Sequence, residues 1–123
     1  MPKLGTRAVL LGLRKGKDID VDQLGKVTRP AFRPGGKNGL SCSATIDSLP
    51  LFALPVEWGG SNNKTTVWEL HMDDLPAELV AGDDSIPGRN RHVSLGPGMT
   101  MGYDEFVNFI EATRTLWRKV TKT

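Results

Sequence analysis

An apolar repeat near the end of the chain constrains the fold more than any other feature of the sequence. Large or apolar side chains recur there at helical spacing, at Phe106, Phe109, Ile110, Thr113, Trp117 and Val120. Side chains at positions i, i+3, i+4 and i+7 lie on one face of an α-helix. The repeat therefore predicts an amphipathic helix that packs its aromatic stripe against a sheet.

The residues around this repeat place the predicted helix at residues 100–120. Thr100 suits the N-cap position, and Asp104 and Glu105 would lie in the first turn. Arg118 and Lys119 would lie in the last turn, where positive charge stabilises the helix dipole. We expect one terminal helix with these bounds.

The rest of the chain is divided into short segments. The sequence contains 14 glycines and 8 prolines, all of them before residue 103. Because these residues interrupt helices and strands, we expect short strands at residues 8–11, 40–44, 65–71, 78–81 and 91–95. A short helical turn is expected at residues 47–54. Residues 15–39 are expected to form a long loop with at most short strands around Val27 or Phe32.

These elements predict a mixed α+β fold. Short strands joined mostly by brief turns favour antiparallel pairing, so we expect a small antiparallel sheet core with one C-terminal helix. The length of 123 residues suits a single domain, residues 1–123, with its own core.

Composition limits the function classes. With 38% hydrophobic and 24% charged residues, the chain is typical of a globular domain rather than a disordered segment. The net charge of +2 is too small to argue for DNA binding. The single cysteine excludes an internal disulfide, so a reducing compartment fits best. The apolar run at residues 8–13 is too short for a secretory signal or a membrane span. We therefore expect a cytoplasmic protein, which could also be delivered into target cells, with no membrane partner.

Few residues offer chemistry on their own. Cys42 would need a histidine base to act as a nucleophile, and the sequence pairs it with neither His71 nor His92. A cysteine between two strand serines is more often a buried apolar side chain. One cysteine and two separated histidines give no metal-ligand spacing, and no glycine-rich phosphate-binding motif is present.

Acidic pairs at 73–74 and 83–84 are typical of turns, although adjacent carboxylates also serve as acid and base.

A third set of residues, scattered along the sequence, could bind a nucleotide. An arginine at the end of the first strand, Arg7 or Arg14, could hold a diphosphate, because its planar fork donates paired hydrogen bonds. Ser41 and Ser43 on a strand could orient a ribose, and His92 opens a later strand.

The order of these features resembles one family. In the first half of the chain the resemblance rests on the stretch TRAVL from Thr6, and on PAFRP from Pro30 followed by NGLS from Asn38. In the second half it rests on HVSLGP from His92, and on Met99-Thr100 leading to Glu105-Phe106, Thr113-Arg114 and Trp117. Together they are similar to the ADP-ribosyltransferase-like toxins of the type VI secretion system and their fungal and actinobacterial relatives. The similarity spans roughly residues 6–120.

The resemblance implies an ADP-ribosyltransferase-like split antiparallel sheet that holds NAD, and a toxin that transfers ADP-ribose in bacterial competition. It implies that Arg7, with Arg14 as its competitor, meets the dinucleotide, and that Ser41 and Ser43 line the nicotinamide side. His92 is implied to lie at the catalytic centre.

An acidic residue usually stabilises the oxocarbenium-like state of such a transfer. The nearby acidic positions are Glu69, Glu78, Asp83 and Asp84. None stands in the superfamily's glutamate motif, and Asp83 and Asp84 are the catalytic candidates that we carry forward.

Two other functions fit the sequence. One is a non-enzymatic interaction module, such as an immunity or adaptor protein, which would use the 15–39 loop and the basic residues at 114–119. The other is an RNA-acting toxin, because six basic residues lie in or next to that loop. Their charge is interrupted by Asp18, Asp20 and Asp22, which favours a solvated loop. A toxin would also imply a cognate immunity or antitoxin protein.

Overall fold

A computed structural model of the chain describes Leu13, residues 15–43, Val56, residues 59–60, residues 68–85 and residues 92–119. The strand expected at 8–11, the helical turn expected at 47–54, and both Arg7 and Arg14 lie outside these residues.

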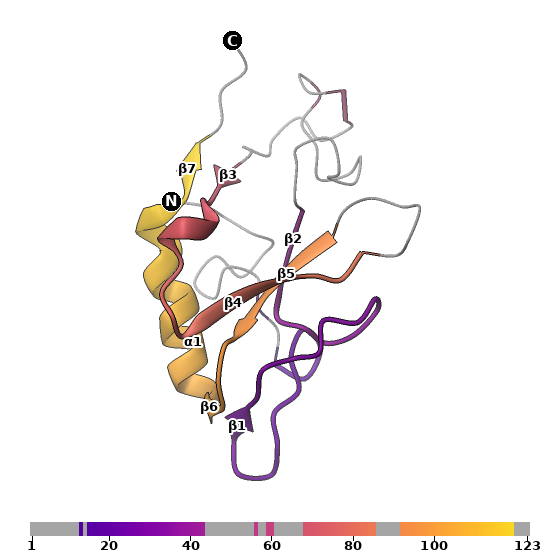
Figure 1. Ribbon diagram of the computed structural model, residues 1–123, viewed down its shortest axis with the longest axis vertical. Coiled ribbons are helices and arrows are strands. Elements are labelled where there is room, and N and C mark those ends of the chain that lie inside the picture. Colours follow the sequence, from indigo (N-terminus) through magenta and orange to yellow (C-terminus); the bar gives the residue numbers. More distant parts are fainter. Residues whose placement is uncertain are drawn as a thin grey trace.

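A three-stranded antiparallel sheet forms the centre of the described fold (Figure 1). Its strands are β2 (Leu40–Ser43), β4 (Leu79–Asp83) and β5 (His92–Pro97), in the spatial order β2-β5-β4. The strands expected at 40–44, 78–81 and 91–95 are therefore present, and β4 and β5 each extend two residues further than predicted. β5 is the middle strand, so residues from both neighbours meet across it.

The register separates an apolar face from a polar face. Leu40 pairs with Leu95, and Ala81 pairs with Leu95 from the other side. Ser43 pairs with His92, one residue out of phase with those apolar positions. Because successive side chains in a strand alternate between faces, the leucines lie on one face of the sheet and the histidine on the other.

The C-terminal helix exists but is shorter than predicted. α1 spans Tyr103–Ala112, is followed by the 3₁₀ turn η5 (Thr113–Leu116), and the chain then enters β7 (Arg118–Lys119). The prediction of a helix over 100–120 is therefore wrong at both ends. Arg118 lies in a strand that pairs with β3 (Trp68–Glu69), not in a last helical turn.

Tertiary pairing explains the change at both ends. Residues before the helix form β6 (Met101–Gly102), which pairs with β1 (Lys26–Val27), so Gly102 replaces Thr100 as the N-cap. Glu105 Oε1 accepts a hydrogen bond from the Gly102 N–H at 3.3 Å. At the other end, the strand pairing of β7 outweighs the local helical preference, which is only a few tenths of a kcal/mol per residue, about 0–0.7.

The core lies between α1 and the apolar face of the sheet. Phe106 and Ile110 on the helix are fully buried, and with them are Leu13, Ile19, Val27, Leu40, Leu79, Leu95 and Met101. Trp117, beyond the helix, still packs against this core. Its indole N–H donates to Thr113 Oγ1 at 3.1 Å, and the Thr113 hydroxyl donates to the Ile110 carbonyl at 2.6 Å.

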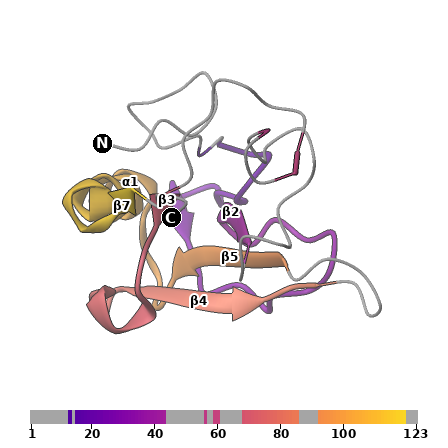
Figure 2. The ribbon, with the colours of Figure 1, turned by 90° about the horizontal axis from the view of Figure 1, so that it is seen from above.

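Residues 15–39 form a long loop, whose course Figure 2 shows from above, and backbone pairing joins its strand β1 to β6. β1 confirms the short strand expected around Val27, whereas Phe32 lies in no strand. Isolated bridges join Ile19 to Lys15 and to Asn38. In Figure 1 the helix lies on the left of the molecule and this loop at the bottom and lower right, with β1 beside β6. The described part is a mixed α+β fold, as predicted, and none of its helices is long and apolar enough to cross a membrane.

Candidate functional site

A polar network surrounds Asp84, the residue directly after β4. The side chain is 4% exposed, and three donors hold it. Ser94 Oγ donates to Oδ2 at 2.6 Å, and Asn38 Nδ2 donates to the same oxygen at 2.8 Å. His92 Nδ1 lies 2.5 Å from Oδ1. Both carboxylate oxygens are therefore used inside the protein.

The network keeps Asp84 ionised. Burial by itself would raise the pKa of this carboxyl, because a dry environment disfavours charge. The hydrogen bonds from Ser94, His92 and Asn38, together with the charge of His92, outweigh burial and lower the pKa below its usual value of 3.8. At neutral pH Asp84 therefore carries a negative charge that only accepts hydrogen bonds.

His92 is fixed on one side and open on the other. Its side chain is 43% exposed, although Asp84 beside it is buried. Its backbone N–H donates to Ser85 Oγ at 3.0 Å, and its carbonyl accepts from the Asp84 N–H at 3.1 Å. An ionised carboxylate requires the proton on Nδ1, so in the neutral ring Nε2 carries the lone pair. The fold thus presents a histidine with a defined tautomer on a rigid strand.

Two serines lie across the strand pair from this histidine. Ser43 pairs directly with His92, and Ser41 pairs with Ser94. Residues directly opposite in an antiparallel pair have Cβ atoms about 5 Å apart and share a face. Asp84, His92 and Ser43 therefore form a row across three neighbouring chain segments, with the histidine in the middle.

The loop from 30 to 38 covers part of this face. Asn38 is buried and links the loop to Asp84, while its amide also donates to the Arg33 carbonyl at 2.8 Å. Phe32 lies against Gly82 so closely that a Cβ on that glycine would be 2.1 Å from the ring. Phe32 also has a φ of +54°, a strained value for a bulky residue. Such strain gathers at functional sites, where the surrounding structure enforces it.

Gly39 connects the loop to β2 and explains the Asn-Gly signal in the sequence. Its φ is +118°, and a Cβ there would lie 2.0 Å from the Leu95 carbonyl oxygen. Only glycine fits this position, so Asn38 enters the network because the chain turns immediately after it.

Cys42 faces away from the polar row. It pairs with Val93 and packs against the core, as the alternation of β2 predicts. Burial, with a contribution from the charge of Asp84, raises the pKa of the thiol to about 12. Because the thiolate is the nucleophile, a thiol that stays protonated at neutral pH is poorly suited to nucleophilic catalysis.

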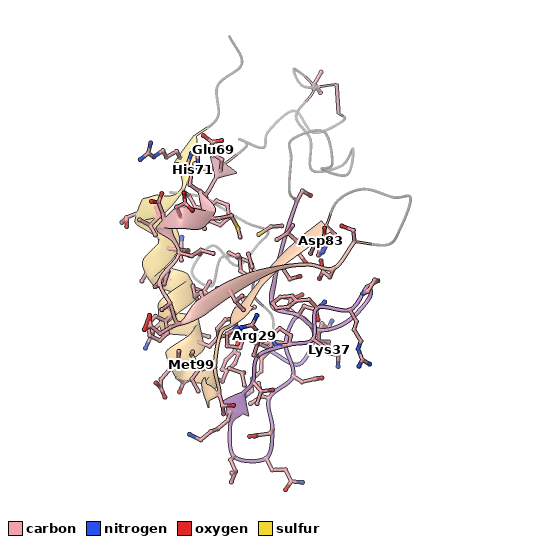
Figure 3. The ribbon with its side chains drawn as sticks, in the orientation of Figure 1. Arg29, Lys37, Glu69, His71, Asp83 and Met99 are labelled. Atoms are coloured by element: carbon pink, nitrogen blue, oxygen red, sulfur yellow. The ribbon has the colours of Figure 1, made fainter. Side chains whose placement is uncertain are left out.

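The remaining candidate residues lie away from this network or outside the described residues. Asp83 is on the opposite face from Asp84, where its carboxylate accepts from the N–H and hydroxyl of Ser85 (Figure 3). His71 lies beside β3, well apart from Asp83 in the same view. The structure therefore brings Asp84, His92 and Ser43 together, and not Asp83 or His71. Arg7 and Arg14 are outside the described residues.

Neither Asn38 nor Ser94 was predicted to lie in the site. Ser94 could have been found, since it lies two residues after His92 on a strand and must share its face. Asn38 could not, because its turn signal gives no hint of contact with a residue 46 positions away.

The contacts of two lysines in the basic loop bear on the RNA hypothesis. Lys37 Nζ lies 3.2 Å from Asp20 Oδ1, and Lys15 Nζ lies 5.3 Å from the centre of the Tyr103 ring. Asp22 accepts hydrogen bonds from the N–H groups of Leu24 and Lys26. The contacts of Lys37 and Asp22 stay within the loop, as is typical of solvated charges, whereas Lys15 reaches α1.

Comparison of the chain with models of protein families, with curated proteins and with solved structures found no match. Within residues 13–119, as far as the structure describes them, no group of three or more His, Cys, Asp or Glu side chains could hold a metal ion.

Proposed function

We propose that this protein is a toxin that binds NAD and transfers its ADP-ribose. The observation that supports this most is the meeting of distant segments on one face of the sheet. Asn38 and His92–Ser94, which belong to two motifs of the resemblance, meet at Asp84, and Ser41 and Ser43 pair with Ser94 and His92 beside it.

The geometry suits a dinucleotide with a reactive sugar. Serine hydroxyls and a histidine on a flat strand pair can bind ribose hydroxyls and the nicotinamide amide. The adjacent negative charge of Asp84 stabilises positive charge on the histidine and, at longer range, on an oxocarbenium-like ribose. In this proposal His92 contacts the substrate, Ser41 and Ser43 orient it, and Asp84, Ser94 and Asn38 position His92. Arg7 or Arg14 would hold the diphosphate.

Three measurements test the proposal. NAD should raise the melting temperature, since ligand at 100 times its dissociation constant stabilises the folded state by about 2.7 kcal/mol. The purified protein should also release nicotinamide from NAD. Cytoplasmic expression should arrest growth, and a co-expressed immunity protein, if one exists, should restore it.

Variants locate the activity. His92→Ala, Ser43→Ala and Arg7→Ala should each reduce nicotinamide release and toxicity while the protein remains folded. His71→Ala is the matched control, because it removes the other histidine from an exposed position beside η4 (Met72–Asp74). A melting temperature that does not respond to millimolar NAD, with no nicotinamide released, would reject the proposal and favour a non-enzymatic interaction module. Loss of RNA in the same extract without nicotinamide release would favour the RNA-acting alternative.

A further inference from the structure

The network around Asp84 also bears on what can accept the ADP-ribose. Asp84 cannot touch a bound ligand, because its side chain is 4% exposed and both of its oxygens already accept hydrogen bonds. Among the described residues, Asp83 is the nearest other carboxylate in sequence, and it lies on the opposite face. Among the described residues of the polar network, the imidazole of His92 is therefore the group that is both exposed and able to take a proton.

The position of the imidazole ring determines which of its two nitrogens is open to a substrate. Nδ1 is held by Asp84, and the two ring nitrogens point in divergent directions, so Nε2 faces away from that carboxylate. Among the residues that the structure describes, none forms a hydrogen bond with Nε2. Ser43 pairs with His92 from the strand on the other side of β5. The free ring nitrogen thus lies on the same face of the sheet as Ser41 and Ser43.

We propose that His92, held by Asp84, is the general base of this site and that the acceptor is a neutral oxygen nucleophile, either water or a hydroxyl group. This inference rests on the proposed function. In the step, the bond between the ribose carbon and the nicotinamide nitrogen breaks, and its electron pair leaves with nicotinamide. The acceptor oxygen bonds to the same carbon, and its proton passes to Nε2 and then to solvent.

The chemistry of the base sets this acceptor class. A water or hydroxyl oxygen attacks with a lone pair that it already has, and becomes strongly acidic only as the new bond forms. A neutral imidazole can accept the proton at that moment. An arginine guanidinium is positively charged at all physiological pH values and must lose a proton before it can attack. It would also need an exposed carboxylate to hold it beside a cationic sugar, whereas Asp84 is enclosed.

Product analysis tests the acceptor class. The whole chain is incubated with NAD in water, in water with methanol, and in water with agmatine, a guanidine compound. We expect ADP-ribose in the first case, methyl ADP-ribose in addition in the second, and no agmatine adduct in the third. If the share of methyl ADP-ribose among the products is well above the mole fraction of methanol in the solvent, a hydroxyl group is the preferred acceptor. If no methyl ADP-ribose forms, the acceptor is water. An agmatine adduct as the main product would overturn the inference.

Variants test the base itself. His92→Gly should lower nicotinamide release at least about 100-fold, the lower range for a general base, and added imidazole should restore part of the rate. Asp84→Asn should lower kcat with little change in KM, because an amide in place of Oδ1 allows the other tautomer and puts a proton on Nε2. Thr115→Ala changes an exposed residue of η5 and is the control variant, which should release nicotinamide at the wild-type rate.

The outcomes separate the two proposals. If the wild-type protein releases no nicotinamide and gains no stability from NAD, both fail. If it releases nicotinamide but imidazole does not rescue His92→Gly, although NAD still raises that variant's melting temperature, the general-base inference fails alone. The same conclusion follows if Asp84→Asn retains the wild-type kcat.

Discussion

At position 42 the sulfur faces the core side of the central sheet, while the serines on either side face the polar network. Strand alternation alone decides this, because adjacent residues of a strand cannot share a face. The raised thiol pKa of about 12 follows from that placement. The residue that attracts attention in the sequence is therefore a packing residue.

A thiol-labelling experiment checks this assignment. At pH 8 the thiolate of folded Cys42 should be roughly a thousandfold rarer than that of a free cysteine, so alkylation by iodoacetamide should be slow and become fast in denaturant. Cys42→Ala should cost about 1 kcal/mol of stability, the value of one buried methylene-sized group, and leave nicotinamide release unchanged. Rapid labelling of the native protein would contradict this.

Asp84 links stability to pH. Its pKa is lowered in the folded state, so it stabilises the protein above the unfolded value near 3.8. That stability is lost as pH falls through the folded pKa. Urea unfolding should therefore show a loss below about pH 4 that is smaller in Asp84→Asn.

At pH 7, Asp84→Asn should itself be less stable by about 1–3 kcal/mol, because hydrogen bonds to a charged carboxylate are replaced by weaker ones to a neutral amide. Asp73→Asn controls for the loss of one negative charge, since it lies exposed in η4. An Asp84→Asn protein with wild-type stability at pH 7 would show that the network contributes nothing to folding.

At the scale of elements, the 30–38 loop packs closely against β4. The contact of Phe32 with Gly82 leaves no space for a side chain on the strand, and the strained φ of Phe32 is maintained by the packing around it. This contact holds the loop, and with it Asn38, over Asp84.

Gly82→Ala should push the Phe32 ring away and cost about 1–3 kcal/mol, the usual range for overpacking. The same change should lower nicotinamide release by moving the loop. Adding Phe32→Ala should remove most of the additional cost, so the two changes should be non-additive in a double-mutant cycle. Strict additivity in chemical denaturation would mean that the two residues do not share this contact.

At the scale of the whole molecule, α1 and the sheet depend on one small core. Phe106 and Ile110 are the helix residues fully buried in it, and Leu95 of β5 lies in the same cluster. β5 therefore connects the core on one face with the polar network on the other.

Phe106→Ala should remove about 3–5 kcal/mol, a large part of the 5–15 kcal/mol that is typical of a folded domain. Thermal unfolding followed by circular dichroism would measure it, and the site should lose NAD-dependent stabilisation in parallel. Asn108→Ala, on the exposed side of the same helix, should change stability by less than about 0.5 kcal/mol. Equal effects of the two changes would contradict the described core.

The sequence by itself determined the fold class, the three central strands, the presence of a terminal helix and the opposite orientations of Cys42 and its two serines. These follow from local periodicity, which depends only on near neighbours along the chain. The bounds of the helix were decided by the tertiary structure, because β6 and β7 pair with β1 and β3 and override local preference. The choice of Asp84 over Asp83, and the meeting of Asn38, His92 and Ser94 around it, also needed the tertiary structure. Two adjacent aspartates look alike in sequence, and only the strand register decides which of them faces the histidine.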